Sequence, residues 1–339
     1  EYNKDYWKNF FKWIRIKAKL RIVWINNWRI LQMGKPNIKT IGVLTSGGDA
    51  PAMNAAVRAV ARIGKERGLK VKGIRKGYNG LLNEDIIDLT PTETADTIFR
   101  GGTILFTARC EEFKTEEGQK RGAEICKAHG IDGLVVIGGD GSFQGAKKLA
   151  ALGINTIAVP GTIDLDIACT EYTIGFDTAV NTAMEAIDKI RDTSTSHERC
   201  SIVEVMGRGA GYIALWCGMA TGAEDILIPE SFDGNLPKVE QQIIEHLLRN
   251  RAKGKTHHMV INAEGVGHSY SMAKRIESAT GIETRATILG HMQRGWKPNS
   301  KRPCIRFYDG CLRSLTYYVQ GKTKPCCWIP ERKIHGYGH

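Results

Sequence analysis

The sequence lacks long apolar runs, regularly spaced cysteines and an apolar leader. No apolar run approaches the ~20 residues that a membrane-spanning helix needs. Charges interrupt residues 1–32 every few positions, which excludes the apolar core of a signal peptide. Of the nine cysteines, four lie after residue 295 and the other five have no metal-ligand spacing. The sequence therefore predicts a reduced, cytoplasmic protein that does not bind a membrane.

Over most of the chain, positive and negative residues are nearly balanced in number. The sequence also has no low-complexity tracts and no short repeats. The formal net charge is +12 at pH 7, but residues 1–32 contribute +6 and residues 296–339 contribute +7. Subtracting these +13 leaves residues 33–295 with a net charge of −1. A nearly neutral body excludes the broad basic surface typical of nucleic-acid-binding proteins, so we expect no nucleic acid as a partner.

The length of 339 residues is sufficient for two α/β domains. Short apolar runs alternate with helical patterns, of which the clearest cover residues 53–67 and 119–129. The apolar runs that predict strands are residues 39–45, 70–74, 133–137, 155–159, 201–205, 225–228 and 258–263. Because several of these runs end in glycine turns, we expect parallel, doubly wound sheets with ligands at the carboxyl ends of the strands.

Two glycine-rich turns follow predicted strands, at Gly47-Gly48-Asp49 and at Gly138-Gly139-Asp140-Gly141-Ser142. Adjacent glycines let backbone N–H groups approach phosphate oxygens. Phosphate would repel the aspartate of such a loop unless Mg²⁺ lay between them, so Asp140 is the expected magnesium ligand. Each loop taken alone is equally consistent with a tight turn and a capping aspartate. Two such loops in one sheet favour a nucleotide site.

Two carboxylates, Asp164 and Asp166, follow another predicted strand in the segment PGTIDLD at residues 160–166. In phosphoryl transfer, one carboxylate can accept the proton of the substrate hydroxyl group. A solvated acidic turn is the alternative interpretation of this segment alone. Five arginines adjoin loops or strand ends, and the guanidinium group matches phosphate geometry. They are Arg109, Arg199, Arg208, Arg285 and Arg294.

Taken together, these motifs closely resemble those of bacterial ATP-dependent 6-phosphofructokinase. The similarity is almost continuous from about residue 39 to residue 295, and it is carried by six strings. They are IGVLTSGGDAPAMN (41–54), RGGTILFTAR (100–109), VVIGGDGS (135–142), PGTIDLD (160–166), EVMGRGAG (204–211) and ETRATILGHMQRG (283–295).

The resemblance implies an α/β fold with two similar doubly wound domains, an active site in the cleft between them, and a homotetramer. Residues 33–174, completed by part of 292–339, would form the ATP-binding domain. Residues 175–291 would form the fructose-6-phosphate-binding domain. The implied reaction is the ATP-dependent phosphorylation of fructose 6-phosphate at its 1-hydroxyl group, with Mg²⁺ as cofactor and with allosteric regulation, in glycolysis.

The resemblance also assigns roles to residues of this chain. Asp164 would be the base beside Thr162, and Arg109 and Arg208 would offset charge on the transferred phosphoryl group. The implied ATP ligands are Gly48, Tyr78, Arg109, Cys110, Gly139, Asp140, Gly141 and Ser142, with Mg²⁺ on Asp140. The implied sugar-phosphate ligands are Thr162, Ile163, Asp164, Arg199, Met206, Gly207, Arg208, Glu264, Arg285, His291, Met292, Gln293 and Arg294. Of these, Arg199 and Arg285 would come from the neighbouring subunit.

An effector site for ADP or phosphoenolpyruvate at a subunit interface is implied as well. Its matching positions are Arg58, Arg62, Arg191, Gly222, Ala223, Glu224, Lys253, Lys255, Thr256 and His257. Pro91 stands where some members carry an effector-binding arginine, which leaves the strength of regulation open.

The phosphoryl donor follows from Gly141 and Gly161. Pyrophosphate-using relatives tend to carry aspartate and lysine at these two places, so the glycines favour ATP. Within the family-like stretch, Ala52 replaces a usual glycine, which is a small change, and Leu165 replaces an asparagine between the two aspartates. Leu165 and the anomalous tail leave a catalytically impaired nucleotide-binding paralogue as one alternative. A pyrophosphate-dependent phosphofructokinase is the other.

Both ends of the chain depart from the family. After Gly295 the resemblance stops, and a shift of one base in the reading frame gives family-like sequence for much of residues 296–339. We therefore expect this segment to be frameshifted translation, which sequencing of the coding DNA would test. Residues 1–32, before Met33, are expected to be a non-native leader. The alternative, a basic arm that binds membrane or RNA, is disfavoured by poor helical periodicity.

Overall fold

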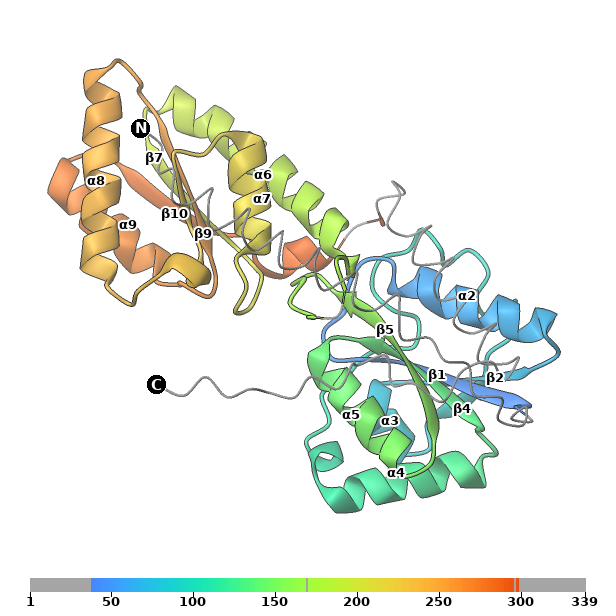
Figure 1. The fold of residues 1–339 in the computed structure, drawn as a ribbon. Coiled ribbons are helices and arrows are strands. Elements are labelled where there is room, and N and C mark those ends of the chain that lie inside the picture. Colours follow the sequence, from blue (N-terminus) through green and yellow to red (C-terminus); the bar gives the residue numbers. More distant parts are fainter. Residues whose placement is uncertain (1–37, 169, 296, 299–339) are drawn as a thin grey trace, which may run out of the picture.

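The computed structural model describes residues 38–168, 170–295 and 297–298. Within these ranges the chain forms two open sheets, each with helices on both faces (Figure 1). The predicted α/β fold is confirmed. The expected leader, residues 1–32, lies outside the described residues, as does the expected frameshifted tail apart from residues 297 and 298. None of the described helices is long and apolar enough to cross a membrane.

The first sheet has six strands in the order β3-β2-β1-β4-β5-β6. Their bounds are β1 Thr40–Ser46, β2 Lys70–Ile74, β3 Ile86–Asp88, β4 Gly133–Gly138, β5 Asn155–Thr162 and β6 Ile174–Gly175. All neighbouring pairs are parallel except β2 and β3, which are antiparallel. The expectation of a wholly parallel sheet is therefore wrong at this edge, where a three-residue strand returns directly beside β2.

Helix α2 (Met53–Glu66) covers one face of this sheet, and helices α3 (Gly77–Leu82), α4 (Glu116–Ala128) and α5 (Asp140–Ala151) cover the other (Figure 1). Every residue of β1 and β4 is buried. Strands covered on both faces have continuous apolar sequences rather than alternating ones, which is why the sequence revealed them.

The second sheet is wholly parallel, in the order β10-β7-β9-β8. Its strands are β7 Cys200–Val205, β8 Asp225–Leu227, β9 His258–Ala263 and β10 Thr284–Ile288. Helices α6 (Phe176–Ser196) and α7 (Tyr212–Thr221) pack on one face, and α8 (Leu236–Ala252) and α9 (Ser269–Thr280) pack on the other (Figure 1). Strand β10 is partly buried, and its sequence TRATI contains a charged residue and no continuous apolar run.

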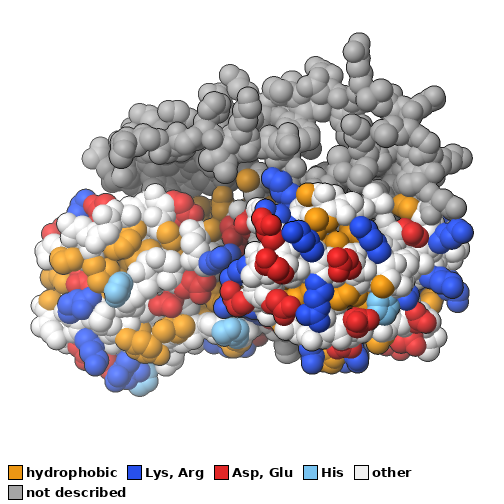
Figure 2. All heavy atoms as spheres, turned by 90° about the horizontal axis from the view of Figure 1, so that it is seen from below, with side chains coloured by type: hydrophobic (Ala, Val, Ile, Leu, Met, Phe, Trp, Pro, Cys, Tyr) orange, Lys and Arg blue, Asp and Glu red, His pale blue; other side chains and the backbone are white. Residues whose placement is uncertain are grey.

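One cluster of buried apolar side chains joins the two halves of the molecule. It extends from the α2 side of the first sheet through Ile163, Ile174 and Phe176 to Val203 and Ile213 of the second half. The expected domain boundary between residues 174 and 175 falls within β6 and stays a prediction. On the face shown in Figure 2, positive and negative side chains are interspersed rather than gathered into one patch.

Candidate active site

The glycine loop of the first sheet joins β4 directly to α5. Gly139 is the residue before the helix, and Asp140 and Gly141 begin its first turn. The backbone N–H groups of a helix N-terminus, together with the helix dipole, favour an anion. A Cβ atom at Gly138 would lie 2.4 Å from the carbonyl oxygen of Ser46, so the close approach of β4 to the end of β1 requires glycine there.

Two of the expected ATP ligands, Ser142 and Tyr78, make hydrogen bonds that hold this loop in place. The Ser142 hydroxyl donates to the carbonyl oxygen of Ser46 at 2.9 Å, and the Tyr78 hydroxyl donates to the carbonyl oxygen of Ser142 at 2.6 Å. The buried Tyr78 ring stacks on Phe113 with a centroid distance of 4.0 Å. A Cβ atom at Gly145 would lie 2.7 Å from that ring, so α5 packs against it. Direct contact of Tyr78 and Ser142 with a nucleotide stays a prediction.

The second glycine turn follows β1 and lies beside an arginine from the other half of the chain. A Cβ atom at Gly48 would lie 2.8 Å from Nη1 of Arg294. The carbonyl oxygen of Gly47 accepts a hydrogen bond of 2.7 Å from Thr107, which brings the Thr107–Cys110 segment to the same place. Arg109 is exposed and Cys110 is half-buried in this segment.

The carboxylate turn begins later than predicted. Strand β5 continues to Thr162, so Pro160 and Gly161 lie in the strand rather than in a loop. The following apolar residues are buried, and the two aspartates that alternate with them are more exposed. The buried residues are Ile163, Leu165 and Ile167, at 2%, 8% and 5% exposure.

The electrostatic environment of Asp164 suits a base. Burial raises the pKa of this carboxyl group above its ordinary value, and repulsion by Asp166 raises it further. The Thr162 hydroxyl and the positive charge of Arg294 oppose the shift, and Glu264 adds to it. A raised pKa makes the ionised carboxylate a better proton acceptor. The Asp164 N–H also donates to the Thr162 hydroxyl oxygen at 3.2 Å.

The loop after β7 is held by two side chains from elsewhere in the chain. One Glu264 oxygen accepts the N–H groups of Gly207, at 3.2 Å, and of Arg208. The Gln293 carbonyl oxygen accepts the N–H of Met206 at 2.8 Å. Gln293 is 0% exposed, so within this structure it connects two loops. Its expected contact with substrate stays a prediction, as does that of Ile163, which is also buried.

The remaining residues after β10 lie in the short helix η3 (Gly290–Arg294). His291 and Met292 are exposed there, and the guanidinium group of Arg294 points across to the first half of the chain, 3.8 Å from an Asp49 oxygen. The structure therefore brings together the glycine turn after β1, the Asp164 turn after β5, and Arg294. The sequence placed Asp49 in this glycine turn but gave it no role of its own.

The expected magnesium ligand is accessible to solvent. Asp140 is exposed at the start of α5. Among the described residues, no three His, Cys, Asp or Glu side chains converge on a metal position. Mg²⁺ usually takes one or two protein carboxylates and completes its shell with water and substrate phosphates, so a single Asp140 is consistent with it.

Arg199 and Arg285 lie at the amino ends of strands in the second sheet, away from the carboxyl ends that carry the candidate site. Arg199 directly precedes β7 and Arg285 is the second residue of β10, so both are at the amino ends of strands whose carboxyl ends carry the site. At ~3.3 Å per residue, β7 separates Arg199 from Met206 by roughly 20 Å. Both arginines bind Glu283, at 2.6 Å for Arg199 and 2.9 Å for Arg285. Glu283 opens the family-like string at residues 283–295, but sequence reasoning assigned it no role in the site.

The expected effector residues fall into two groups. Arg58 and Arg62 lie on α2, next to the first sheet. The others lie in the second half: Glu224 pairs with Lys255 and accepts the Met259 N–H at 2.6 Å, and Arg191 donates to the Thr221 carbonyl oxygen. Burial, and then the charge of Lys255, lower the pKa of His257. In one chain the two groups do not meet.

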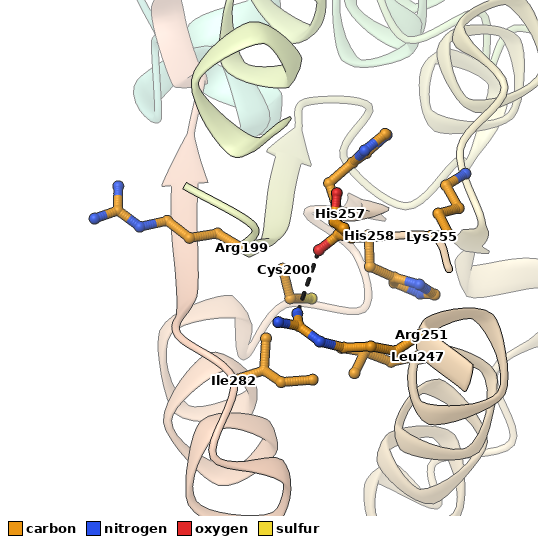
Figure 3. A pocket seen from close by; sticks show the side chains of 9 residues that line it. Arg199, Cys200, Leu247, Arg251, Lys255, His257, His258 and Ile282 are labelled. Atoms are coloured by element: carbon orange, nitrogen blue, oxygen red, sulfur yellow. Dashed lines mark hydrogen bonds between the residues drawn. The ribbon is translucent and has the colours of Figure 1, made fainter. Parts of the chain in front are cut away.

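A shallow pocket lies beside the second effector group (Figure 3). Its polar lining includes Lys255, Thr256 and His257, and Arg251 lies below them and donates to the Thr256 carbonyl oxygen at 3.3 Å (Figure 3). Arg251 and the buried His258 were not singled out from the sequence. They lie inside a helix and a strand, where no motif marked them.

Comparison with known proteins adds the family. The sequence profile described as Phosphofructokinase matches residues 40–304. The chain is 62% identical over 303 residues to the ATP-dependent 6-phosphofructokinase of Clostridium botulinum strain Hall, covering 88% of this chain and 91% of that protein. It is 58% identical over 297 residues to the protein of the same name from Clostridium novyi, with the same coverage of 88% and 91%.

Solved structures give the same answer. The phosphofructokinase of Saccharomyces cerevisiae matches with a TM-score of 0.77 and 33% identity, over 85% of this chain and 42% of that longer chain. A pyrophosphate-dependent phosphofructokinase from Marinobacter aquaeolei has a TM-score of 0.72 at 24% identity, covering 84% of this chain and 77% of that one, which supports the fold alone. With its glycine loops, its Asp164 turn and this similarity over most of its length, the chain belongs to the phosphofructokinase family.

Proposed function

We propose that this chain is an ATP-dependent 6-phosphofructokinase, which transfers the terminal phosphoryl group of ATP to the 1-hydroxyl group of fructose 6-phosphate. Relatives of that name match 88% of the chain at 62% identity. The observation that carries the proposal is the position of the Asp164 turn. A Cβ atom at Gly139 would lie 3.8 Å from that of Thr162, so the phosphate loop and the carboxylate turn adjoin.

The reaction follows from these positions. Asp164 accepts the proton of the sugar 1-hydroxyl group. The oxygen of that hydroxyl group forms a bond to the terminal phosphorus of ATP, and the bond from this phosphorus to the ADP oxygen breaks. The exposed Arg109 and Arg208 offset the charge of the moving phosphoryl group. Asp140 would hold Mg²⁺, which neutralises phosphate charge when bound. Arg294 and Glu264 bind the sugar phosphate, with the loop at Met206–Arg208.

Two glycines support ATP as the donor. A Cβ atom at Gly141 would meet nothing within 4 Å, which is consistent with open space for a nucleotide beside the loop. At the buried Gly161, a Cβ atom would lie 3.1 Å from both Ile137 and Met53, so a lysine there would not fit without movement. These positions, and the lower identity to pyrophosphate-dependent relatives, disfavour a pyrophosphate-dependent enzyme.

The proposal includes the assembly of this chain into a homotetramer. Because Arg199 and Arg285 lie at the far edge of the second sheet, they serve the site of a neighbouring subunit, in a homotetramer. The two effector groups would meet across another interface and bind ADP or phosphoenolpyruvate there. The net charge of −1 over residues 33–295 supports small-molecule substrates rather than a nucleic acid or membrane partner, and the proposed glycolytic activity favours the cytoplasm.

A second candidate, a catalytically impaired nucleotide-binding paralogue, is favoured by one observation. Leu165, between the two aspartates, has a backbone φ of +59°, which is unfavourable for a leucine. The test is a coupled assay of the full chain with fructose 6-phosphate and either ATP or pyrophosphate. Fructose 1,6-bisphosphate formed only with ATP is the expected result. ATP binding without turnover would favour the impaired paralogue, and turnover with pyrophosphate would overturn the choice of donor.

A further inference from the structure

The active-site turn contains a leucine in a conformation that leucine rarely adopts. Leu165 has a φ of +59° and is 8% exposed. In the left-handed region the Cβ atom crowds the backbone, and only glycine, asparagine and aspartate visit this region readily. Such a residue persists only where its surroundings hold it there. The question is what holds Leu165, and what its conformation does for its neighbours.

The side chain of Leu165 is held by the apolar core. It belongs to the buried cluster that joins the two halves of the chain, which also contains Ile163. On either side of it, Asp164 is half-buried and Asp166 is exposed. The turn therefore has an apolar side packed on the core and a more exposed acidic side, with Leu165 at its centre.

The acidic side faces groups from the second half of the chain. The charges of Arg294, on η3, and Glu264, after β9, act on Asp164, and the charge of Asp166 acts on Tyr212, at the start of α7. The backbone of Asp164 has one polar tie within the turn, the 3.2 Å hydrogen bond to the Thr162 hydroxyl. Leu165 has no polar side-chain atom that could add another.

We propose that Leu165 is the positioning residue of this turn, and that its buried side chain anchors the turn to the core and thereby holds Asp164 in its half-buried position. The proposal rests on the proposed function, in which Asp164 is the base. It differs from a polar turn, where an asparagine would both accept the left-handed conformation and hydrogen-bond locally. In this chain, apolar burial replaces that polar support.

The raised pKa of Asp164 supports this arrangement, since burial is its largest cause and Asp164 lies between two buried residues of the turn, Ile163 and Leu165. If the anchor is removed, water gains access to the carboxyl group and its pKa falls toward the ordinary value. The charged groups that act on Asp164 remain in place: Asp166 and Glu264, which raise its pKa, and Arg294, which lowers it. A shift on loss of Leu165 therefore reports solvation of Asp164.

The test compares three substitutions in the full chain. Leu165→Ala removes the anchor, Leu165→Met keeps its volume, and Leu165→Asn accepts the left-handed conformation without the apolar anchor. Ile131→Ala is the control, because Ile131 is 3% exposed in a different core cluster. The measurements are kcat and both KM values against pH, the melting temperature, and the Asp164 carboxyl pKa by NMR titration, which does not require turnover.

We expect Leu165→Ala to lower kcat by about tenfold to a hundredfold, as displacements of ~1 Å do, with little change in the KM for ATP. The acid limb of its kcat profile and the Asp164 pKa move to lower pH, while Leu165→Met changes neither. Ile131→Ala lowers only the melting temperature. Leu165→Ala behaving like this control would overturn the proposal, and so would a Leu165→Asn variant faster than the parent. If the unsubstituted chain has no turnover, only the proposed function is overturned. The NMR titration of Asp164 in the parent and in Leu165→Ala still tests whether Leu165 anchors the turn.

Discussion

Arg294 and Asp49 face each other across the two halves of the molecule, with Nη1 of the arginine 3.8 Å from Oδ1 of the aspartate. The same guanidinium group lies over Gly48, where a Cβ atom would be 2.8 Å from Nη1. At this distance the pair is weak, and Arg294 Nε is buried without a hydrogen-bond partner in the described part of the chain. An arginine held in this way is available to an arriving phosphate.

Arg294→Ala is expected to raise the KM for fructose 6-phosphate by roughly tenfold to a hundredfold, because charge-assisted hydrogen bonds contribute ~1.5–3 kcal/mol. Arg294→Lys recovers only part of the loss, since an ammonium group lacks the two-pronged geometry. The KM for ATP changes little. Steady-state kinetics check this, with the exposed Arg249→Ala as the matched control. Equal effects on both KM values would contradict a specific role in sugar-phosphate binding.

Asp164→Asn is expected to lower kcat by about a hundredfold to ten-thousandfold, the usual range for loss of a positioned base. The two KM values stay near those of the parent. In the parent, kcat falls on the acid side as Asp164 becomes protonated. Because its pKa is raised, this acid limb lies above the ordinary range of an aspartate. An asparagine variant with parental kcat would show that another group takes the proton.

The same substitution has a predicted effect on stability. The folded state raises the pKa of Asp164, so between the ordinary and the raised value it binds more protons than the unfolded state. The free energy of unfolding therefore falls as pH rises through this window. Asp164→Asn removes that loss, and its melting temperature exceeds that of the parent at neutral pH. Differential scanning calorimetry should show the difference shrinking as the pH falls below the ordinary value.

Gly141→Asp is expected to weaken ATP binding without lowering the stability of the fold. Its Cβ atom meets nothing within 4 Å, and an acid in the first turn of α5 is favourable to the helix, so the melting temperature holds. The added charge repels ATP phosphates and raises the KM for ATP by roughly tenfold, or about 1.4 kcal/mol. Gly161→Ala is the contrast: its Cβ atom is crowded at 3.1 Å, and the melting temperature falls. An unchanged KM for ATP in Gly141→Asp would contradict the placement of the nucleotide.

Ala52→Gly is expected to stabilise the protein. Ala52 precedes α2 with a φ of +75°, where an alanine costs about 1–2 kcal/mol relative to glycine. The gain should raise the melting temperature by ~2–4 °C. The control is Ala61→Gly inside the same helix, which should lower it, since glycine costs about 0.5–1 kcal/mol there. A lower melting temperature for Ala52→Gly would mean that the left-handed backbone at this residue imposes no strain.

Ala52 and Leu165 also mark the limit of what the sequence could predict. Both were recognised as departures from a family pattern of glycine and asparagine, but their common property, a positive φ, is a backbone feature that only the structure reveals. Continuous apolar runs placed β1, β4 and β9 to within a residue or so. The short or half-exposed β3, β6 and β10 had no such run, because their pairing depends on neighbours distant in the sequence.

The site shows the same division. The glycine loops and Asp164 are local motifs whose chemistry can be read from neighbouring residues. The roles of Gln293 and Glu283 include contacts between distant segments: Gln293 binds the loop at Met206, and Glu283 binds Arg199. No spacing along the chain encodes such contacts. Gln293 was expected in the site and Glu283 was not, and the partners of both needed the fold.

The arginines at the far edge of the second sheet give the last prediction, which tests whether sites are shared between subunits. Arg285→Ala and Asp164→Asn are each expected to be nearly inactive alone, and Arg285 is exposed enough, at 66%, for its loss to spare the fold. If a site combines Asp164 of one chain with Arg285 of another, random co-assembly restores about a quarter of the sites.

The measurement is activity after the two variants are dissociated together and reassembled, with an undissociated mixture as the control. Restored sites contain the intact Asp164 of one chain and the intact arginine of its neighbour, while the reciprocal sites carry both substitutions. Arginines that served their own chain's site would leave every site with one substitution, and the mixture would stay inactive. Within one chain, Arg285 lies near the amino end of β10 and Asp164 follows the carboxyl end of β5. We therefore expect the mixture of the two variants to regain activity.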